Sequence, residues 1–217
     1  MNKAILRIVG IALVVSPAIG IAQSRKPTAA TYITKEDVDK VNATPGVDRT
    51  IKVMDIGDQH FSVGIIHRGK TGAPAAAAAG GAARGGAPAT PPANTRACGD
   101  TTGTPSGSSG IAHDKQTEGY YIVSGAGTMV TGGKILNGRT SAPDSEVTTT
   151  LNGPSCSGQM GGSDVVKRDV KVGDIVIIPA GVYHGFSEVP DHIEYVSIRP
   201  DLEKVLPGGY VNPALKK

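Results

Sequence analysis

Two segments with glycines at their turns, residues 113–125 and 173–188, constrain the fold of this chain more than any other feature. Each contains a short run of β-branched and other apolar residues bounded by glycine-containing turns. Runs of this length match strands, and similar runs recur between residues 50 and 198. Because helical patterns are almost missing, the sequence predicts an all-β protein, either a β-barrel or a β-sandwich.

The expected elements can be placed along the chain from propensity and turn residues. A short helix is expected over residues 34–42, with Thr34 as its N-cap. Gly132 and Gly133 are expected to form a tight hairpin turn, and residues 137–164 a long loop. The expected strands are residues 50–55, 60–68, 118–124, 128–131, 134–136, 147–151, 165–170, 174–179, 185–188 and 193–198.

The first 22 residues have the pattern of a secretory signal. A basic start is followed by the apolar run 8–15 and by small residues at Gly20 and Ala22. The alternative, a membrane anchor, is disfavoured because the run is shorter than the roughly 20 residues that span a bilayer and is interrupted by Pro17. The pattern therefore predicts cleavage after Ala22 and a periplasmic or secreted protein.

The charge of the mature chain argues against two classes of partner. Loss of Lys3 and Arg7 with the leader lowers the formal net charge from +3 to about +1. Nucleic acids and anionic lipids require clustered Lys and Arg, which this balance does not supply. No further apolar stretch is long enough to cross a membrane. A small molecule is therefore the expected partner.

About 195 residues remain after cleavage, which fits one domain. Residues 71–110 form a low-complexity insertion rich in Ala, Gly, Pro and Ser. The expected division is a signal peptide (1–22), an N-terminal segment with the short helix (23–49), the first barrel strands (50–70), the insertion (71–110), the core (111–200) and a C-terminal tail (201–217).

The mature chain contains two cysteines, Cys98 and Cys156. In an exported protein an even pair favours a disulfide, and no C-x-x-C spacing indicates a zinc or redox motif. The bridge would join two stretches rich in Gly, Pro and Ser. Two free thiols are the alternative.

Three residues have the chemistry of metal ligands. His113 precedes a polar turn, Glu118 begins the next expected strand, and His184 lies on a later strand. A barrel that brings these strands together would combine two imidazoles with one carboxylate and leave coordination positions open, as catalytic metal centres require.

The first of the two segments resembles the first motif of the cupin family, G-x5-H-x-H-x3-4-E-x6-G. His113, Glu118 and Gly125 have the spacing of its second half. Ile111 stands in the place of the leading histidine of the motif. Together with His184 of the second segment, the resemblance therefore implies three metal ligands and leaves the fourth role without a residue.

The second segment resembles the second cupin motif, G-x5-P-x-G-x2-H-x3-N. Gly173, Pro179, Gly181 and His184 fit it up to its last residue, where Glu188 stands in place of the usual Asn. The resemblance covers roughly residues 111–200. It implies a single jelly-roll β-barrel, often dimeric, that holds Mn, Fe, Zn, Ni or Cu inside its mouth.

Several other residues are candidates for the surroundings of such a site. Tyr120 and Phe186 each lie two residues from an expected ligand, so strand alternation places them on the same face as pocket walls beside Ile111. Tyr120 is also a candidate general acid or base. His67 is considered as a substitute fourth ligand, and Arg199 is expected to pair with Asp201.

Three functions are compatible with these patterns. The favoured one is a metal-dependent cupin enzyme of oxygenase, isomerase or lyase type that acts on a small organic molecule. The alternative is a non-catalytic binding module, since no Ser-His-Asp arrangement stands out in the sequence. A metal-free epimerase-like cupin, with His113 as base, ranks last because exported proteins rarely meet nucleotide sugars.

Overall fold

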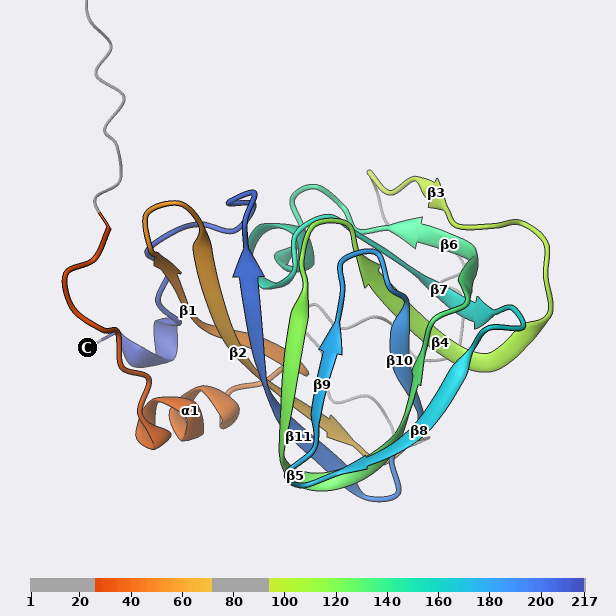
Figure 1. The fold of residues 1–217 in the computed structure, drawn as a ribbon, viewed down its shortest axis with the longest axis horizontal. Helices are drawn as coiled ribbons and strands as arrows, with labels where there is room; N and C mark the ends of the chain where they lie inside the picture. Colours follow the sequence, from red (N-terminus) through yellow and green to blue (C-terminus); the bar gives the residue numbers. More distant parts are fainter. Residues whose placement is uncertain (1–25, 72–93, 217) are drawn as a thin grey trace, which may run out of the picture.

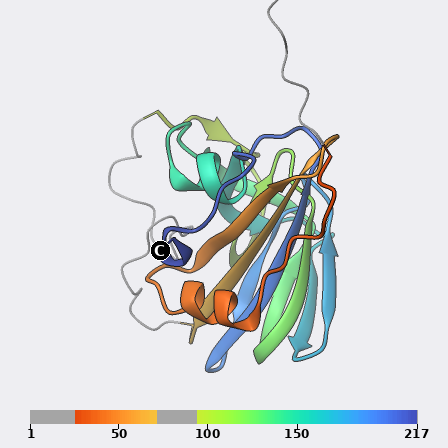
Figure 2. The same ribbon diagram turned by 90° about the vertical axis from the view of Figure 1, so that its left-hand side faces the viewer.

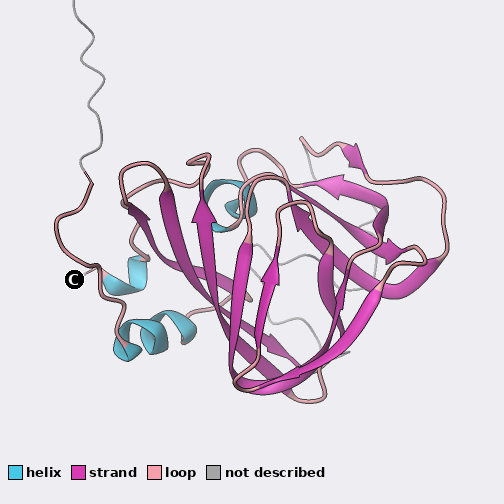
Figure 3. Ribbon diagram, in the orientation of Figure 1, coloured by secondary structure: helices cyan, strands magenta, loops and turns pink. Residues whose placement is uncertain are grey.

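The computed structural model describes residues 26–71 and 94–216, so the predicted signal peptide and most of the low-complexity insertion lie outside the described residues. The described chain is built mainly from antiparallel strands with three short helices at the periphery (Figure 3). Its elements are α1 Lys35–Asn42, β1 Asp48–Asp55, β2 His60–Gly69, β3 Ala97–Cys98, β4 Pro105–His113, β5 Glu118–Thr131, β6 Lys134–Thr140, η1 Val147–Leu151, β7 Ser155–Gly161, β8 Val166–Lys171, β9 Ile175–Ile178, β10 His184–Glu188, β11 His192–Asp201 and η2 Pro213–Leu215.

The strands form two sheets that share one long strand, β5 (Figure 1). One sheet has the order β1-β2-β11-β5-β9, and the other has the order β8-β5-β10-β4-β7-β6-β3. Their facing sides enclose an apolar core that includes Ile122, Met129, Ile193 and Tyr195. This all-β jelly-roll barrel confirms the expected fold class.

Gly125 allows β5 to belong to both sheets. Residues before it pair with β11 and β9, and residues after it pair with β8 and β10. Its φ is +68°, and a Cβ at this position would collide with the backbone carbonyl of His192. Only glycine tolerates both conditions without strain. The expected strands 118–124 and 128–131 are therefore one strand, which bends at Gly125 without ending.

Helix α1 packs on the outside of the barrel. The Thr34 side chain accepts a hydrogen bond from the backbone N–H of Asp37, as expected of an N-cap. Val41 on its buried face contacts Ile51 of β1 and Ile65 of β2. Figure 2 shows the helix lying against these two strands. The predicted helix and the two strands that follow it are thus confirmed.

Four local expectations differ from the structure for tertiary reasons. Residues 147–151 form a π-helical turn closed by the Asn152 N–H and the Val147 carbonyl, although β-branched residues suggested a strand. The strands on either side of Gly132–Gly133 do not pair, because β6 pairs with β3 and β7. The long loop expected over residues 137–164 contains β7, and β4 begins at Pro105, inside the predicted insertion.

The predicted disulfide between Cys98 and Cys156 is confirmed, with the two Cα atoms 6.1 Å apart. Cys98 lies on β3, a two-residue strand that pairs only with β6 among the described residues. Cys156 lies on β7 and is largely buried. The bond therefore fixes a segment that backbone pairing alone holds weakly.

No helix within the described ranges is long and apolar enough to span a bilayer.

Removal of this bond should lower the free energy of unfolding measurably. The two cysteines are 58 residues apart, so a Cys98→Ser, Cys156→Ser double variant releases a long loop in the unfolded chain. We expect a loss of about 2–4 kcal/mol in urea unfolding. A reducing agent should lower the stability of the wild type and leave the double variant unchanged; an equal response of both proteins would contradict this role.

Candidate metal centre

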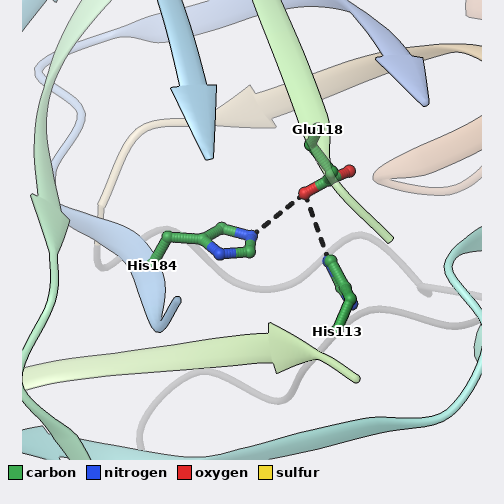
Figure 4. Close-up of side chains that lie close together, drawn as sticks. All are labelled: His113, Glu118 and His184. Carbon is green, nitrogen blue, oxygen red and sulfur yellow. Dashed lines mark ion pairs between the residues drawn. The ribbon is translucent and has the colours of Figure 1, made fainter. Parts of the chain in front are cut away.

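Three neighbouring strands bring the three expected ligand residues together. His113 ends β4, Glu118 begins β5, and His184 begins β10. The register pairs His184 with Ile111 on β4 and with Thr131 on β5, and the Gly181 N–H donates to the His113 carbonyl. The sequence prediction that these side chains converge is thus met in the fold (Figure 4).

The three side chains meet at one carboxylate oxygen. Oε2 of Glu118 lies 3.2 Å from Nε2 of His113 and 3.1 Å from Nε2 of His184. The candidate ligand atoms all lie within 4.8 Å of one another. Each of the three residues is at most 3% exposed. The cluster is therefore shielded from bulk water, and opposite charges interact more strongly in such a buried site than in water.

The outer hydrogen bonds of the two histidines fix their tautomers. His184 Nδ1 lies 3.0 Å from the Val182 carbonyl, which can only accept, so Nδ1 carries a proton. His113 Nδ1 lies 2.8 Å from Ser155 Oγ. The Ser155 hydroxyl donates its single proton to the Gly153 carbonyl, so His113 Nδ1 must donate to Ser155.

The neutral form of each histidine therefore turns an Nε2 lone pair toward the Glu118 carboxylate. Two lone pairs and an anion that face each other at about 3 Å repel, unless a proton or a cation lies among them. Burial lowers the pKa of His113, which disfavours a second proton on that ring. Nitrogen and carboxylate donors with outer hydrogen bonds are the arrangement that holds a divalent transition metal.

The second oxygen of Glu118 is held by a buried arginine. Arg199 Nε donates to Oε1 at 2.7 Å, and Ser197 Oγ donates to the same atom at 3.2 Å. The opposite end of the guanidinium pairs with Asp48 at 2.7 Å. Burial alone would raise the pKa of Glu118, but Arg199 and the histidines hold it well below its usual range. Glu118 thus stays anionic and directs Oε2 toward the histidines.

Sequence reasoning missed this role of Arg199. Its expected partner Asp201 instead accepts hydrogen bonds from the backbone N–H groups of Val205 and Leu206. The signal was present in the alternation of β11, where Tyr195, Ser197 and Arg199 all face inward. An arginine at an inward position of a strand requires a buried carboxylate, and Glu118 is such a group.

Tyr120 is a direct neighbour of the centre. Its hydroxyl donates to Glu118 Oε2 at 2.6 Å, and its ring lies edge-on to His184 with centroids 6.1 Å apart. Burial and the adjacent carboxylate raise its pKa well above the usual value, so the phenol keeps its proton at neutral pH. The centroid of the Phe186 ring lies 5.9 Å from that of the Tyr195 ring. The roles of Tyr120, Phe186 and Ile111 as pocket walls stay predictions.

His67 does not belong to the centre. Its Nδ1 lies 2.8 Å from Glu194 Oε1, and its ring stacks on His192 with centroids 6.2 Å apart. Among the described residues, the group that could hold a metal consists of His113, Glu118 and His184. The expectation that His67 substitutes for the missing fourth ligand is therefore wrong, because β2 turns this side chain away from the barrel interior.

A second polar chain, formed by Ser124, His192 and Asp191, was not expected from the sequence. His192 Nε2 lies 2.8 Å from Ser124 Oγ, and its Nδ1 lies 2.6 Å from Asp191 Oδ2. The Asp191 side chain is 89% exposed, so water screens its effect on the imidazole. Buried carboxylates orient the histidine in Ser-His-Asp catalysis. We therefore assign this chain to the surface and not to an active site.

Comparisons with known proteins give fold-level likenesses only. No protein-family model and no curated protein matches the sequence. Among solved structures, protein BH2720 from Bacillus halodurans is 12% identical, with a TM-score of 0.39, over 86% of this chain and 92% of that one. The Clostridium difficile EutQ protein is 11% identical, with a TM-score of 0.30, over 80% of this chain and 82% of that one.

A recombinant oxalate oxidase in complex with glycolate also aligns with the chain. It is 14% identical, with a TM-score of 0.32, over 74% of this chain and 54% of that one. The fold assignment rests on the strand order and register described above and not on these likenesses.

Replacement of Arg199 by Met should destabilise the metal-free protein strongly. The variant leaves Glu118 and Asp48 without their shared cation, and breaking a buried pair in this way costs about 3–5 kcal/mol at pH 7. The measurement is denaturant unfolding in the presence of a chelator. Arg139→Met is the control, because Arg139 is exposed on β6 and should be nearly neutral.

The cost of Arg199→Met should depend on pH with a defined sign. In the wild type, the lowered pKa of Glu118 adds stability that is complete above its ordinary value of 4.5 and is lost as the pH falls through the folded-state pKa. Without Arg199, burial raises this pKa, so protonation stabilises the folded variant. The difference in unfolding free energy should therefore shrink between about pH 7 and pH 4. A difference that is constant over this range would contradict the assignment.

Proposed function

We propose that this chain is an exported, cupin-family protein that binds one divalent transition metal through His113, Glu118 and His184. We further propose that it acts on a small organic molecule as an oxygenase, isomerase or lyase. The observation that carries the proposal is the pair of histidine tautomers fixed by Val182 and Ser155. They direct both Nε2 lone pairs at one carboxylate oxygen, an arrangement that a cation stabilises.

The surrounding residues have separable tasks in this proposal. A bound metal would supply Lewis acidity and lower the pKa of a coordinated water. Arg199 and Ser197 hold Glu118 Oε1, so that Oε2 stays available as a ligand. Tyr120 donates a hydrogen bond to Oε2 and is a candidate acid for a substrate near the metal. Ser155 and the Val182 carbonyl orient the two imidazoles, as outer partners do in metal sites generally.

A non-catalytic metal-binding module is the second candidate, and one observation favours it. All three ligand residues are at most 3% exposed. A cavity of about 560 Å³ lies instead on the outer face of the first sheet, where Phe61, Val63 and Ile198 line it. Azide or cyanide added to the Co2+-loaded protein separates the candidates. A shifted visible spectrum indicates an open coordination position, and an unchanged spectrum favours the binding module.

A homodimer is the partner that we propose beyond the small molecule. Ile175 and Ile177 of β9 are 68% and 65% exposed, and Tyr121 of the paired strand is 46% exposed. Exposed apolar side chains that cluster on one face mark interaction surfaces. Sedimentation velocity should give the mass of a dimer, and Ile177→Lys should shift it toward the monomer. A wild type that sediments as a monomer at all concentrations would contradict this proposal.

Elemental analysis of protein recovered from the periplasm tests the metal site. We expect about one transition metal per chain in the wild type and its loss in His113→Ala and in His184→Ala, because each variant removes one of three ligands. His67→Ala is the matched control: it removes a histidine outside the centre and should keep the metal. Full metal content in both ligand variants would sink the proposal.

A further inference from the structure

Gln116 is the least satisfied polar side chain near the centre. It is 1% exposed, and neither its amide oxygen nor its amide nitrogen has a hydrogen-bond partner. A buried polar group without a partner costs free energy, so each one requires an explanation such as a bound water or ion. A carboxamide with both atoms unpartnered is the strongest such case.

Apart from the single hydroxyl of Ser62, the other buried polar atoms without partners belong to groups that are bound through another atom. Asp48 bonds through its second oxygen to Arg199, and Asn152 donates through its amide nitrogen to the same carboxylate. Arg49 is bound through both terminal nitrogens of its guanidinium. Among the described residues, Gln116 is the buried carboxamide with neither atom engaged. The fold therefore does not use this amide for its own hydrogen bonding.

The position of Gln116 relates it to the proposed metal ligands. It lies in the short connection between His113 and Glu118. Burial alternates along this stretch, with Gln116, Glu118 and Tyr120 buried and the residues between them more exposed. Alternation with period two places residues i and i+2 on the same face of an extended chain. Gln116, two residues before Glu118, thus has the burial expected of the inward face.

We propose that Gln116 supplies a fourth protein donor to the cation of this centre through its amide oxygen. The inference rests on the proposed metal function and deepens it. Ile111 leaves the three side-chain ligands without a fourth partner. An amide oxygen adds a hard donor, so the site has two nitrogen and two oxygen ligands and suits Mn2+ or Fe2+ better than a nitrogen-rich set does. The amide N–H2 group is then free to donate to a coordinated water or substrate.

The inference predicts opposite effects of Gln116→Leu on the stability of the metal-free protein and on its affinity for metal. Gln116→Leu keeps the size and removes the unpartnered amide, so the metal-free variant should unfold at a higher temperature than the wild type. The same variant should bind Co2+ and Mn2+ about 10- to 100-fold more weakly in a chelator competition. Gln159→Leu on β7 is the matched control, because Gln159 is exposed and outside the centre.

Gln116→Glu tests the same contact without loss of a donor oxygen. A buried carboxylate with no cation is costly, so this variant should be less stable than the wild type when metal-free. Added Mn2+ should raise its unfolding temperature by more than it raises that of the wild type. This measurement also decides the matter if Gln116→Leu does not fold.

The outcomes separate this inference from the proposal on which it rests. Equal Co2+ affinity and equal visible spectra in wild type and Gln116→Leu, with metal lost in His184→Ala, would overturn the role of Gln116 and leave the metal site standing. An equal metal-induced shift for Gln116→Glu and wild type would overturn it as well. A wild type that binds neither Co2+ nor Mn2+ would remove both.

Discussion

The centre of this protein depends on a single carboxylate whose two oxygens have different partners. Arg199 and Ser197 bind Oε1 of Glu118, and the two histidines and Tyr120 surround Oε2. A carboxylate buried to this degree is stable only when its charge is compensated. Arg199 on β11 also pairs with Asp48 on β1, so these two ion pairs link β1, β11 and β5. The carboxylate thus connects the packing of the first sheet to the chemistry of the centre.

The position of this carboxylate relative to His184 depends on the path of strand β5. This strand begins with Glu118 inside the barrel, bends at Gly125, and continues into the second sheet, where it pairs with β10 and so with His184. A strand that ended at the bend would leave His184 without this register. Glycine is therefore required at position 125 for a structural reason that does not depend on metal, namely the close contact with the His192 carbonyl.

Much of the fold could be predicted from local patterns, and the failures share one cause. The helix after Thr34, the strands near residues 50–69 and 166–198, and the Cys98–Cys156 bond follow from capping, alternation and cysteine count. Residues 147–151 have strand propensity but form a π-helical turn, because they lie between β6 and β7 and bond to their own backbone. Propensity is a weak guide wherever strand partners come from distant parts of the chain.

The sequence by itself determined the all-β class and singled out the two cysteines and the three side chains of the candidate centre, because residue chemistry and strand alternation are local properties. Only the tertiary structure decided the tautomers of His113 and His184, since these depend on Ser155 and on a carbonyl that arrive by folding. It also decided that Arg199 pairs with Glu118 and that Gln116 is buried without a partner. Hydrogen bonds and charge compensation depend on distances between remote residues, which local sequence patterns do not specify.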